Sequence, residues 1–438
     1  MPSQGLVRLS VALFLMGLFT CTWDKLLYLD VRGFTLKSHQ LFFFLSFVLI
    51  LYTRRKYTNA ATLSALKHGF PISVLALSTY YLCSSYWSAF PLKSALYSGW
   101  IVFNLFTIWF TAQLLAPYLQ KKQLTWAAWF TMIFHACVLV VDHAAYQFGY
   151  TGGLVGFNQD EILKWGVSRP HAYASEPSYI AAFFALAIIL NYSEVLAKRS
   201  WRVAPVVLSL FSFFALLATT SRTGLFGLVI GIFLLLSLEL LRRRKLPWRG
   251  LGITAILFII SFAVLFVTTP SPQKKILDSS LVSSVIEGRD GSGNARLRAH
   301  IIAYELAHAS NWLGVGLGAS HKYWTNLNPQ YIAPIDPKKP DHGQELVMSI
   351  WGQLLAEGGL PALVLYGLAG FFLISGIWQA WRLNQSPLTS GALVSSVVFF
   401  FFIAFFLGNV ARGDIWVWFA IWSRMALPDS EEAQPQRV

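Results

Sequence analysis

Long apolar stretches recur along almost the whole chain of 438 residues and are separated by short polar connections. Most of them run for about 17 to 21 residues, which is the length that a helix needs to cross the hydrocarbon core of a bilayer. The pattern predicts twelve membrane-spanning helices, the last of them short and interrupted by Arg424. The predicted spans are Leu6–Thr22, Leu36–Tyr52, Phe70–Tyr86, Ala95–Leu115, Leu124–Ala144, Ile180–Ala197, Val203–Thr220, Leu225–Leu241, Leu251–Val267, Ala362–Trp381, Gly391–Leu407 and Ile415–Leu427.

One polar interruption is much longer than the others. Thr268–Met348 lies between the ninth and tenth predicted spans and carries eight Lys or Arg and seven Asp or Glu residues. Residues 1–267 then hold nine spans, residues 349–428 hold three, and residues 429–438 form a tail. Loops carry function more often than the elements they connect, so we expect the large loop to hold part of the protein's chemistry.

The charge of the short connections predicts the orientation of the chain. With the N-terminus in the cytoplasm, the connections predicted inside hold 15 Lys or Arg in 50 residues, and those predicted outside hold 8 in 71. Because an excess of Lys and Arg marks the cytoplasmic side, both termini are expected in the cytoplasm and the large loop outside. This bias also accounts for the formal net charge of +14, so no nucleic-acid partner is expected.

The composition agrees with this architecture. Hydrophobic residues make up 55% of the chain and charged residues 12%, which excludes an ordinary soluble domain. Leu6–Thr22 has no small-residue cleavage site after it and is predicted to be a retained anchor. Cys21, Cys83 and Cys137 lack paired spacing, which predicts neither a disulfide framework nor a metal site. The predicted fold is an all-α polytopic membrane protein of about 12 transmembrane helices with one large external loop containing amphipathic helices.

Arg222 stands in a connection of four to five residues between two long apolar spans. A connection this short lies near the level of the lipid headgroups. One interpretation is an arginine whose head reaches water while its stem covers apolar surface. The other is a cation directed at an anionic, lipid-linked substrate, because a guanidinium binds phosphate through two parallel hydrogen bonds.

The large loop is predicted to contain a helix over Asn294–Ser310. Leu297, Ile301 and Tyr304 form an apolar stripe on it, so the helix is expected to lie along the membrane surface or to pack on the spans. The glycines of the following segment, Asn311–Gly318, alternate along the chain. Since they follow a helix and do not join a strand to one, they favour a helix stop with close backbone packing over a dinucleotide-binding loop.

A second loop helix is predicted to begin near Asp341, to run to Glu357 and to break at Gly358–Pro361. Asp341 suits the N-cap and Glu345 the first turn, where backbone N–H groups attract negative charge. His342 and Glu345 also lie three residues apart on one helical face, where they would form a general base with its partner. Both interpretations stay open.

The order and spacing of several segments are distinctive: Tyr86–Ser88, Arg169 with Glu176–Ser178, Thr220–Arg222, Asn294–Arg296, Asn311–Gly318 and Leu355–Leu360. Together they resemble the O-antigen ligase and O-antigen polymerase superfamily of bacterial membrane glycosyltransferases, over most of the chain. The resemblance implies a fold similar to the membrane-embedded C-type glycosyltransferases. It also implies inverting, metal-independent transfer of a glycan from a polyprenyl-diphosphate carrier on the periplasmic face of the bacterial inner membrane.

By position, the resemblance implies that Arg222 and Arg296 hold the diphosphate and offset the charge that develops on the leaving group. Arg169 is assigned to the same diphosphate site. No metal or other cofactor is expected, because no external cluster of Asp and Glu has the spacing of a metal-binding loop. Secondary substrate contacts are assigned to Glu176, Arg289 and His171.

The chain departs from the ligase pattern at the general base. That pattern places His-Asn about nine residues before the glutamate that corresponds to Glu357, and Met348-Ser349 stand there in this chain. His342 and Glu345 are therefore the candidates for the base. The departure, together with the segment Ser175–Tyr179, favours a polymerase, whose acceptor is another lipid-linked repeat unit, over a ligase, whose acceptor is the lipid A core.

The expected partners are the polyprenyl-diphosphate-linked glycan, the lipid bilayer, and a chain-length regulator or the lipid A core acceptor. A polysaccharide-lipid transporter is the alternative from a different class. Transporters place ionisable residues inside their spans, whereas only His135 lies near the centre of a predicted span. A lone histidine there is more typical of a packed or hydrogen-bonded side chain than of a proton relay, and the sequence shows no inverted repeat.

Overall fold

The computed structural model describes residues 4–31, 34–54, 69–150, 154–158, 170–197, 203–219, 221–243, 252, 255, 256, 259, 291–323, 349–384 and 386–427. Helices dominate these ranges. Each predicted span other than the ninth coincides with a helix, and of the ninth, Leu251–Val267, only four separate positions are described.

The first part of the chain builds one half of the bundle. The predicted span Ala95–Leu115 consists of three helical pieces in succession, of which the middle one is a π-helix. The elements are α1 (Gln4–Thr20), β1 (Tyr28–Val31), β2 (Phe34–Lys37), α2 (Ser38–Arg54), α4 (Gly69–Ser84), α5 (Pro91–Asn104), η1 (Leu105–Phe110), α6 (Thr111–Leu115), α7 (Lys121–Gln147), β3 (Phe157–Asn158) and β4 (Pro170–Ala172).

The second part supplies the most buried helices. From Pro177 to Ser193 every side chain of α9 is buried, and α19 is buried along most of its length. The elements are α9 (Pro177–Ala197), α10 (Val203–Ala218), α11 (Arg222–Arg243), α15 (Gly291–Ala309), α17 (Ile350–Asn384), α18 (Pro387–Phe401), the 3-10 helix η3 (Ile403–Phe405) and α19 (Gly413–Ala426).

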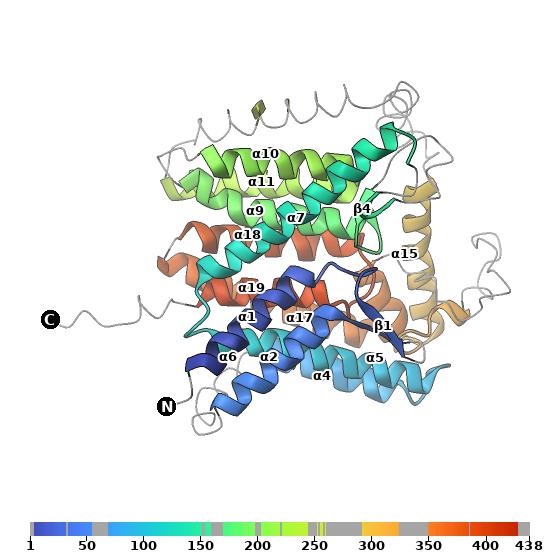
Figure 1. Ribbon diagram of the computed structural model, residues 1–438. Coiled ribbons are helices and arrows are strands. Elements are labelled where there is room, and N and C mark those ends of the chain that lie inside the picture. The colour runs from blue at the N-terminus through green and yellow to red at the C-terminus, as the bar shows by residue number, and fades with distance from the viewer. Residues whose placement is uncertain are drawn as a thin grey trace.

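The bundle has two distinct ends. Figure 1 shows the start of α1 and the short helix α6 at one end, whereas α15 lies across the opposite end together with strands β1 and β4. Between the ends, α9 packs against α11 and α18, and α17 packs against α4. Below, the end that carries α15 is called the α15 end.

Five helices in the described ranges are long and apolar enough to cross a membrane: Pro91–Leu115, Lys121–Tyr146, Arg222–Arg242, Ile350–Leu383 and Pro387–Phe405. Shorter apolar helices accompany them at Gln4–Thr20, Ser38–Thr53, Gly69–Ser84 and Pro177–Ser193. Large apolar side chains such as Phe233, Phe371 and Phe401 are more than half exposed on these helices, as a lipid-facing surface requires. The protein is therefore a helical membrane protein, while the number of twelve spans stays a prediction.

Two small antiparallel sheets correct the all-α prediction. Strand β1 pairs with β2 from Tyr28 opposite Lys37 to Val31 opposite Phe34, and β3 pairs with β4. Both lie in connections at the α15 end (Figure 1). They were not predicted because each strand has only two to four residues, too few to establish an alternating pattern.

The arginine inside the last predicted span has a structural reason. Arg424 is buried in α19, and its guanidinium donates from Nε to the Leu119 carbonyl at 2.9 Å and from Nη2 to the Ala116 carbonyl at 3.1 Å. These carbonyls follow the end of α6, where a helix leaves its last acceptors without intrahelical partners. A cation is favourable at that position, so Arg424 joins α19 to the end of α6.

Helix α15 forms where the loop helix was predicted, but it packs through a different face. Ile301 and Tyr304 of the predicted stripe are exposed by 47% and 55%. Ala299 and Ala303 are small and allow a close approach to α17. The helix therefore packs through the face that carries these alanines and not through the predicted stripe. The side chains on the buried face are Ala299, Ile302, Ala303 and Leu306.

Candidate active site

Hydrogen bonds join the connections at the α15 end to one another. The backbone N–H of Lys25, which precedes β1, donates to the Tyr173 carbonyl at 2.9 Å. The indole of Trp87, in the turn between α4 and α5, donates to the Gly314 carbonyl at 3.0 Å. Segments that are far apart in the sequence therefore form one continuous surface.

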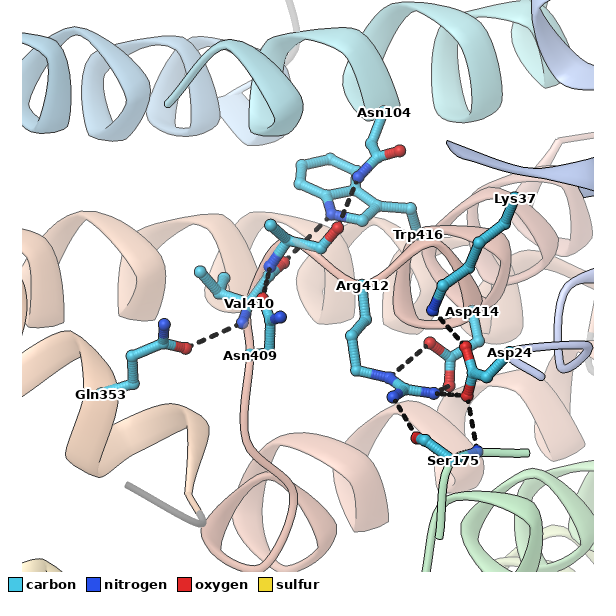
Figure 2. Close-up of polar contacts among 11 residues, drawn as sticks. Asp24, Lys37, Asn104, Ser175, Gln353, Asn409, Val410, Arg412, Asp414 and Trp416 are labelled. Carbon is cyan, nitrogen blue, oxygen red and sulfur yellow. Dashed lines mark hydrogen bonds and ion pairs between the residues drawn. The ribbon is translucent and has the colours of Figure 1, made fainter. Parts of the chain in front are cut away.

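A buried ion cluster lies among these connections, and Figure 2 shows Asp24, Asp414 and Ser175 around Arg412, with Lys37 directed at Asp24. The Arg412 guanidinium contacts Asp24 Oδ2 at 2.8 Å and Asp414 Oδ1 at 3.0 Å, and it donates to Ser175 Oγ at 3.0 Å. Lys37 forms a second ion pair with Asp24. We call these five residues the Arg412 cluster.

The charges of the Arg412 cluster balance one another. Burial alone raises the pKa of Asp24, but Arg412 and Lys37 outweigh burial and hold this pKa well below its usual range. Burial alone lowers the pKa of Arg412, and here Asp24 and Asp414 outweigh it and raise the pKa. The face of the guanidinium also lies 3.5 Å from the centre of the Tyr179 ring. Since the donors of Arg412 are engaged, the cluster acts as an anchor between the N-terminal hairpin, α9 and α19.

The glycine-rich segment after α15 forms a second connection. Gly314, Gly316 and Gly318 all have positive φ angles, of 75°, 96° and 76°, which favour glycine. Gly316 lies so close to Ser88 that a side chain would collide with it. The predicted helix stop with close backbone packing is confirmed.

This segment is seated on the break in α17. Val315 N donates to the Ala356 carbonyl at 3.1 Å, and Leu360 N donates to the Trp312 carbonyl at 2.9 Å. Gly359 has non-helical angles, φ 61° and ψ −159°, which confirms the predicted break. The two parts of α17 meet at a sharp angle.

The distance between two aromatic rings on either side of the break shows that α17 bends there. The rings of Trp351 and Tyr366 are 5.5 Å apart, whereas fifteen residues of straight helix span about 22 Å.

Glu357 lies at this seat and is buried. Its Oε1 accepts a hydrogen bond from Ser320 Oγ at 2.7 Å, and its Oε2 accepts one from Gln353 Nε2 at 2.9 Å. Among the residues that the structure describes, Glu357 has hydrogen-bond donors but no ion pair. We call Glu357, Ser320 and Gln353 the Glu357 seat.

Gln353 connects the two regions. Its Oε1 accepts a hydrogen bond from Val410 N at 3.0 Å, only two residues before Arg412 (Figure 2). The carbonyl of Val410 accepts from the Trp416 indole at 3.2 Å, and Asn104 Nδ2 donates to the Ala411 carbonyl at 2.8 Å. The chain leading into Arg412 is therefore fixed from three sides.

Helix η3 is the meeting point of three elements. The Nε2 atom of His300, on α15, lies 3.3 Å from the Phe405 carbonyl. Gly227 of α11 packs against Ile403. Ser349, just before α17, has its Oγ 3.5 Å from the Ala404 carbonyl. Arg296 precedes His300 by one turn of α15, and Arg222 precedes Gly227 on α11. The two predicted diphosphate-binding arginines thus lie on the two helices, α11 and α15, that contact η3.

A pocket of about 370 Å³ opens beside α15. The aromatic rings of Trp87 and Tyr323 line it together with Asn311 and the Gly314–Val315 backbone. Aromatic rings next to an amide are a common arrangement for the apolar faces and hydroxyl groups of sugars.

Residues 206–367 match the family model described as O-antigen ligase. The predicted resemblance to the O-antigen ligase and O-antigen polymerase superfamily is confirmed over this region. The match begins within α10 and ends within α17, so it includes Arg222, Arg296, the glycine-rich segment and Glu357. No curated protein matches the chain.

The O-antigen ligase match supports a membrane glycosyltransferase in general terms, and it does not separate polymerases from ligases. It also leaves the roles of individual residues open. Those roles rest on where the structure places each predicted residue.

Three predicted substrate residues have described side chains. Arg222 is the first residue of α11 and is partly buried. His171 is buried in β4, where Nδ1 lies 2.7 Å from the Ala174 carbonyl and the ring stacks on Phe157. Glu176 is exposed just before α9 and accepts a hydrogen bond from Ser178 Oγ at 3.1 Å. These contacts hold both side chains in place, and the predicted roles of His171 and Glu176 in binding substrate stay predictions.

The remaining predicted residues are described less fully. Arg296 belongs to α15, but the surroundings of its side chain are not described. The other predicted residues lie outside the described ranges; they are Arg169, Arg289, His342 and Glu345.

The Arg412 cluster was not predicted as a unit. Asp24, Lys37 and Arg412 each stand in a connection predicted to be external, which was the available signal. Asp24 and Arg412 are 388 residues apart, and a single sequence contains nothing that pairs charges over such a separation.

Proposed function

We propose that this protein is a periplasmic-face glycosyltransferase that polymerises polyprenyl-diphosphate-linked oligosaccharide repeat units, by an inverting mechanism without a metal ion. The observation that carries the proposal is the position of Arg222 and Arg296 within the matched region, on two helices that meet at η3. Two arginines on helices that contact the same short helix η3 suit the binding of a diphosphate attached to a lipid.

The start of α11 suits the leaving group. The N-terminus of a helix presents backbone N–H groups and a partial positive charge, both of which attract phosphate. Arg222 adds a guanidinium at the same place. In the reaction, the acceptor hydroxyl loses its proton to a base and its oxygen bonds to the anomeric carbon. The bond from that carbon to the diphosphate oxygen breaks, and the arginines stabilise the negative charge that the diphosphate takes away.

The pocket lined by Trp87 and Tyr323 suits the glycan. It lies at the α15 end, where a sugar attached to a lipid-linked diphosphate would project out of the membrane. Ring faces there would stack on sugar rings, and Asn311 would hydrogen-bond to hydroxyl groups.

A feature of α17 supports the polymerase over the ligase. Ser349 stands where the ligase pattern has its asparagine, and Ser349 Oγ accepts a hydrogen bond from Gly352 N at 3.1 Å while its carbonyl accepts from Gln353 N at 2.8 Å. Ser349 is therefore used as the N-cap of α17. His342 and Glu345 keep the proposed role of general base and partner.

Transport is the second candidate, and one contact disfavours it. His135 was the ionisable residue nearest a predicted span centre. Its Nε2 lies 2.9 Å from Thr22 Oγ1 and its Nδ1 lies 2.8 Å from the Thr131 carbonyl. Both ring nitrogens have fixed partners, as in a structural histidine.

Purified protein supplied with polyprenyl-diphosphate repeat units, with and without lipid A core, tests the proposal. A ladder of products without core indicates a polymerase, and strict dependence on core indicates a ligase. Absence of product under both conditions rejects the glycosyltransferase.

Variants of the proposed site sharpen this test. Arg222→Ala and Arg296→Ala should lower the rate by about 100-fold or more, the usual effect of removing a group that stabilises charge in the transition state. Arg382→Ala is the matched control, because Arg382 is an exposed arginine in the last turn of α17. Normal product from a well-expressed Arg222→Ala variant contradicts the diphosphate assignment, and whichever of His342→Ala or Glu345→Ala keeps full activity is not the base.

A further inference from the structure

A second cavity lies within the membrane-spanning part of the bundle, between α11, α17 and α18. Its volume is about 570 Å³, and its walls are almost entirely apolar. Ser375 carries the one side-chain hydroxyl among its described lining residues. Its walls include Leu234, Gly367, Gly370, Ile374, Val397 and Phe401. We call this cavity the apolar groove.

The groove is elongated along the helices. On the part of α17 that follows the break at Gly359, its lining residues extend from Gly367 to Trp378, which at a helical rise of 1.5 Å per residue is about 16 Å. This length is about half of the hydrocarbon thickness of a bilayer, which is about 30 Å. The groove therefore has the length to hold one hydrocarbon chain that lies along the helices and extends through one leaflet of the bilayer.

One end of the groove reaches η3. Trp351 and Phe401 line that end, and the Trp351 indole donates to the Phe400 carbonyl at 2.8 Å. Ile403, at the start of η3, comes two residues after Phe401. This end of the apolar groove therefore lies next to η3, which α11 contacts through Gly227 and α15 contacts through His300.

This sequence of surfaces matches an amphipathic ligand with an anionic head and a long apolar tail. We propose that the apolar groove binds the isoprenoid chain of the polyprenyl-diphosphate donor, an inference that rests on the proposed function. The diphosphate then lies at the α15 end beside η3, and the first isoprene units pass Trp351 and Phe401 into the groove.

The open space at Gly367 of α17 favours an isoprenoid over a straight acyl chain. A side chain built on Gly367 would meet no atom within 4 Å, so the groove is wide at that point. An isoprenoid carries a methyl branch on each unit and needs more width than a straight chain. Because lipid tails are as apolar as the groove, selectivity has to come from shape of this kind.

The test compares donors with long and short tails in two matched variants. Gly367→Trp fills the groove at its wide point. Gly376→Trp is the control, because Gly376 also lies on α17 with no atom within 4 Å of an added side chain, and it does not line the groove. Each protein is assayed with an undecaprenyl-diphosphate donor and with a farnesyl-diphosphate donor that carries the same glycan.

The expected result is a loss of tail preference in one variant alone. Wild type and Gly376→Trp should show an apparent KM about tenfold lower for the undecaprenyl donor than for the farnesyl donor, and Gly367→Trp should show nearly equal values. Equal tail preference in all three proteins overturns the groove assignment. Activity of the wild type with neither donor rejects the proposed function instead.

A binding experiment on the wild type tests whether the groove binds an isoprenoid chain, and it depends neither on activity nor on the folding of a variant. A polyprenyl phosphate with a photoreactive group in its tail is irradiated with the protein in vesicles of phosphatidylglycerol, and the labelled peptides are identified. Labelling of α17 and α18 that unlabelled undecaprenyl phosphate suppresses supports the proposal. Labelling elsewhere, or labelling that added phosphatidylglycerol suppresses equally well, overturns it.

Discussion

Asp24 and Glu357 are two buried carboxylates at the same end of the bundle, and they are stabilised in different ways. Asp24 contacts two cations, Arg412 and Lys37, inside a cluster whose charges cancel. Glu357 accepts hydrogen bonds from the neutral side chains of Ser320 and Gln353. A buried charge requires either a counter-charge or hydrogen bonds, and the protein uses one solution for each region.

The two carboxylates belong to regions with different structural roles. The Arg412 cluster joins the N-terminal hairpin, the segment before α9 and the start of α19, and an ion pair is lost when any of its four charged members is removed. The Glu357 seat holds the segment after α15 on the break of α17, where backbone hydrogen bonds share the task. The two regions should therefore respond differently to substitution and to pH.

The largest effect is expected from Arg412→Ala. This change leaves Asp24 and Asp414 buried near each other without the guanidinium, and breaking a buried ion pair from one side costs about 3–5 kcal/mol. Thermal unfolding in detergent, followed by tryptophan fluorescence, should show a much lower Tm. Arg382→Ala, on the exposed end of α17, is the control and should leave the Tm unchanged. A Tm close to that of wild type would show that the cluster is not an anchor.

Gly359→Ala tests the backbone part of the seat. The new methyl group would collide with the Trp312 carbonyl oxygen at a residue with positive φ. We expect a loss of about 2–4 kcal/mol, from overpacking and from the unfavourable φ.

Gly376→Ala is the matched control for this change. It lies on the same helix with open space around it, and alanine should be neutral or slightly stabilising there. Equal Tm values for the two variants would contradict the close packing at the break.

Glu357→Gln tests the side-chain part of the seat and should have a smaller effect. The amide keeps the shape and one acceptor oxygen but turns the other acceptor into a donor facing Ser320 or Gln353. One lost buried hydrogen bond costs about 1–3 kcal/mol. The measurement is the Tm, and Glu357→Asp serves as the comparison that keeps the charge. If Glu357→Gln were more destabilising than Arg412→Ala, the distinction between anchor and seat would be reversed.

The smallest effect is expected from pH. The pKa of Asp24 is held low in the folded protein, so its stabilising contribution is complete above the unfolded pKa of about 3.9 and is lost only as the pH falls towards the folded pKa. The Tm difference between wild type and Asp24→Asn should be constant from about pH 8 to pH 5 and should narrow below about pH 4. A difference that already narrows between pH 7 and pH 5 would contradict the ion pairing of Asp24.

The sequence predicted the helices better than it predicted the contacts between them. Apolar length located the predicted spans that coincide with helices in the described ranges, and the glycines located the stop after α15 and the break at Gly359. The sequence did not indicate which face of α15 packs inward, because Ala299 and Ala303 on that face contribute little hydrophobicity. The Arg412 cluster was missed because its members come from three distant connections, and only the folded chain brings them together.

The backbone hydrogen bond between Leu360 N and the Trp312 carbonyl affects which substitutions this region tolerates. It is made by a backbone carbonyl and a backbone N–H, which every residue other than proline can supply. Substitutions of the side chains at 312 and 360 therefore leave the hydrogen bond itself available, whereas Gly359 admits no alternative. Random mutagenesis of this stretch should return many tolerated replacements on either side of a single invariant position, so one glycine defines the angle of α17 for a wide range of neighbouring sequences.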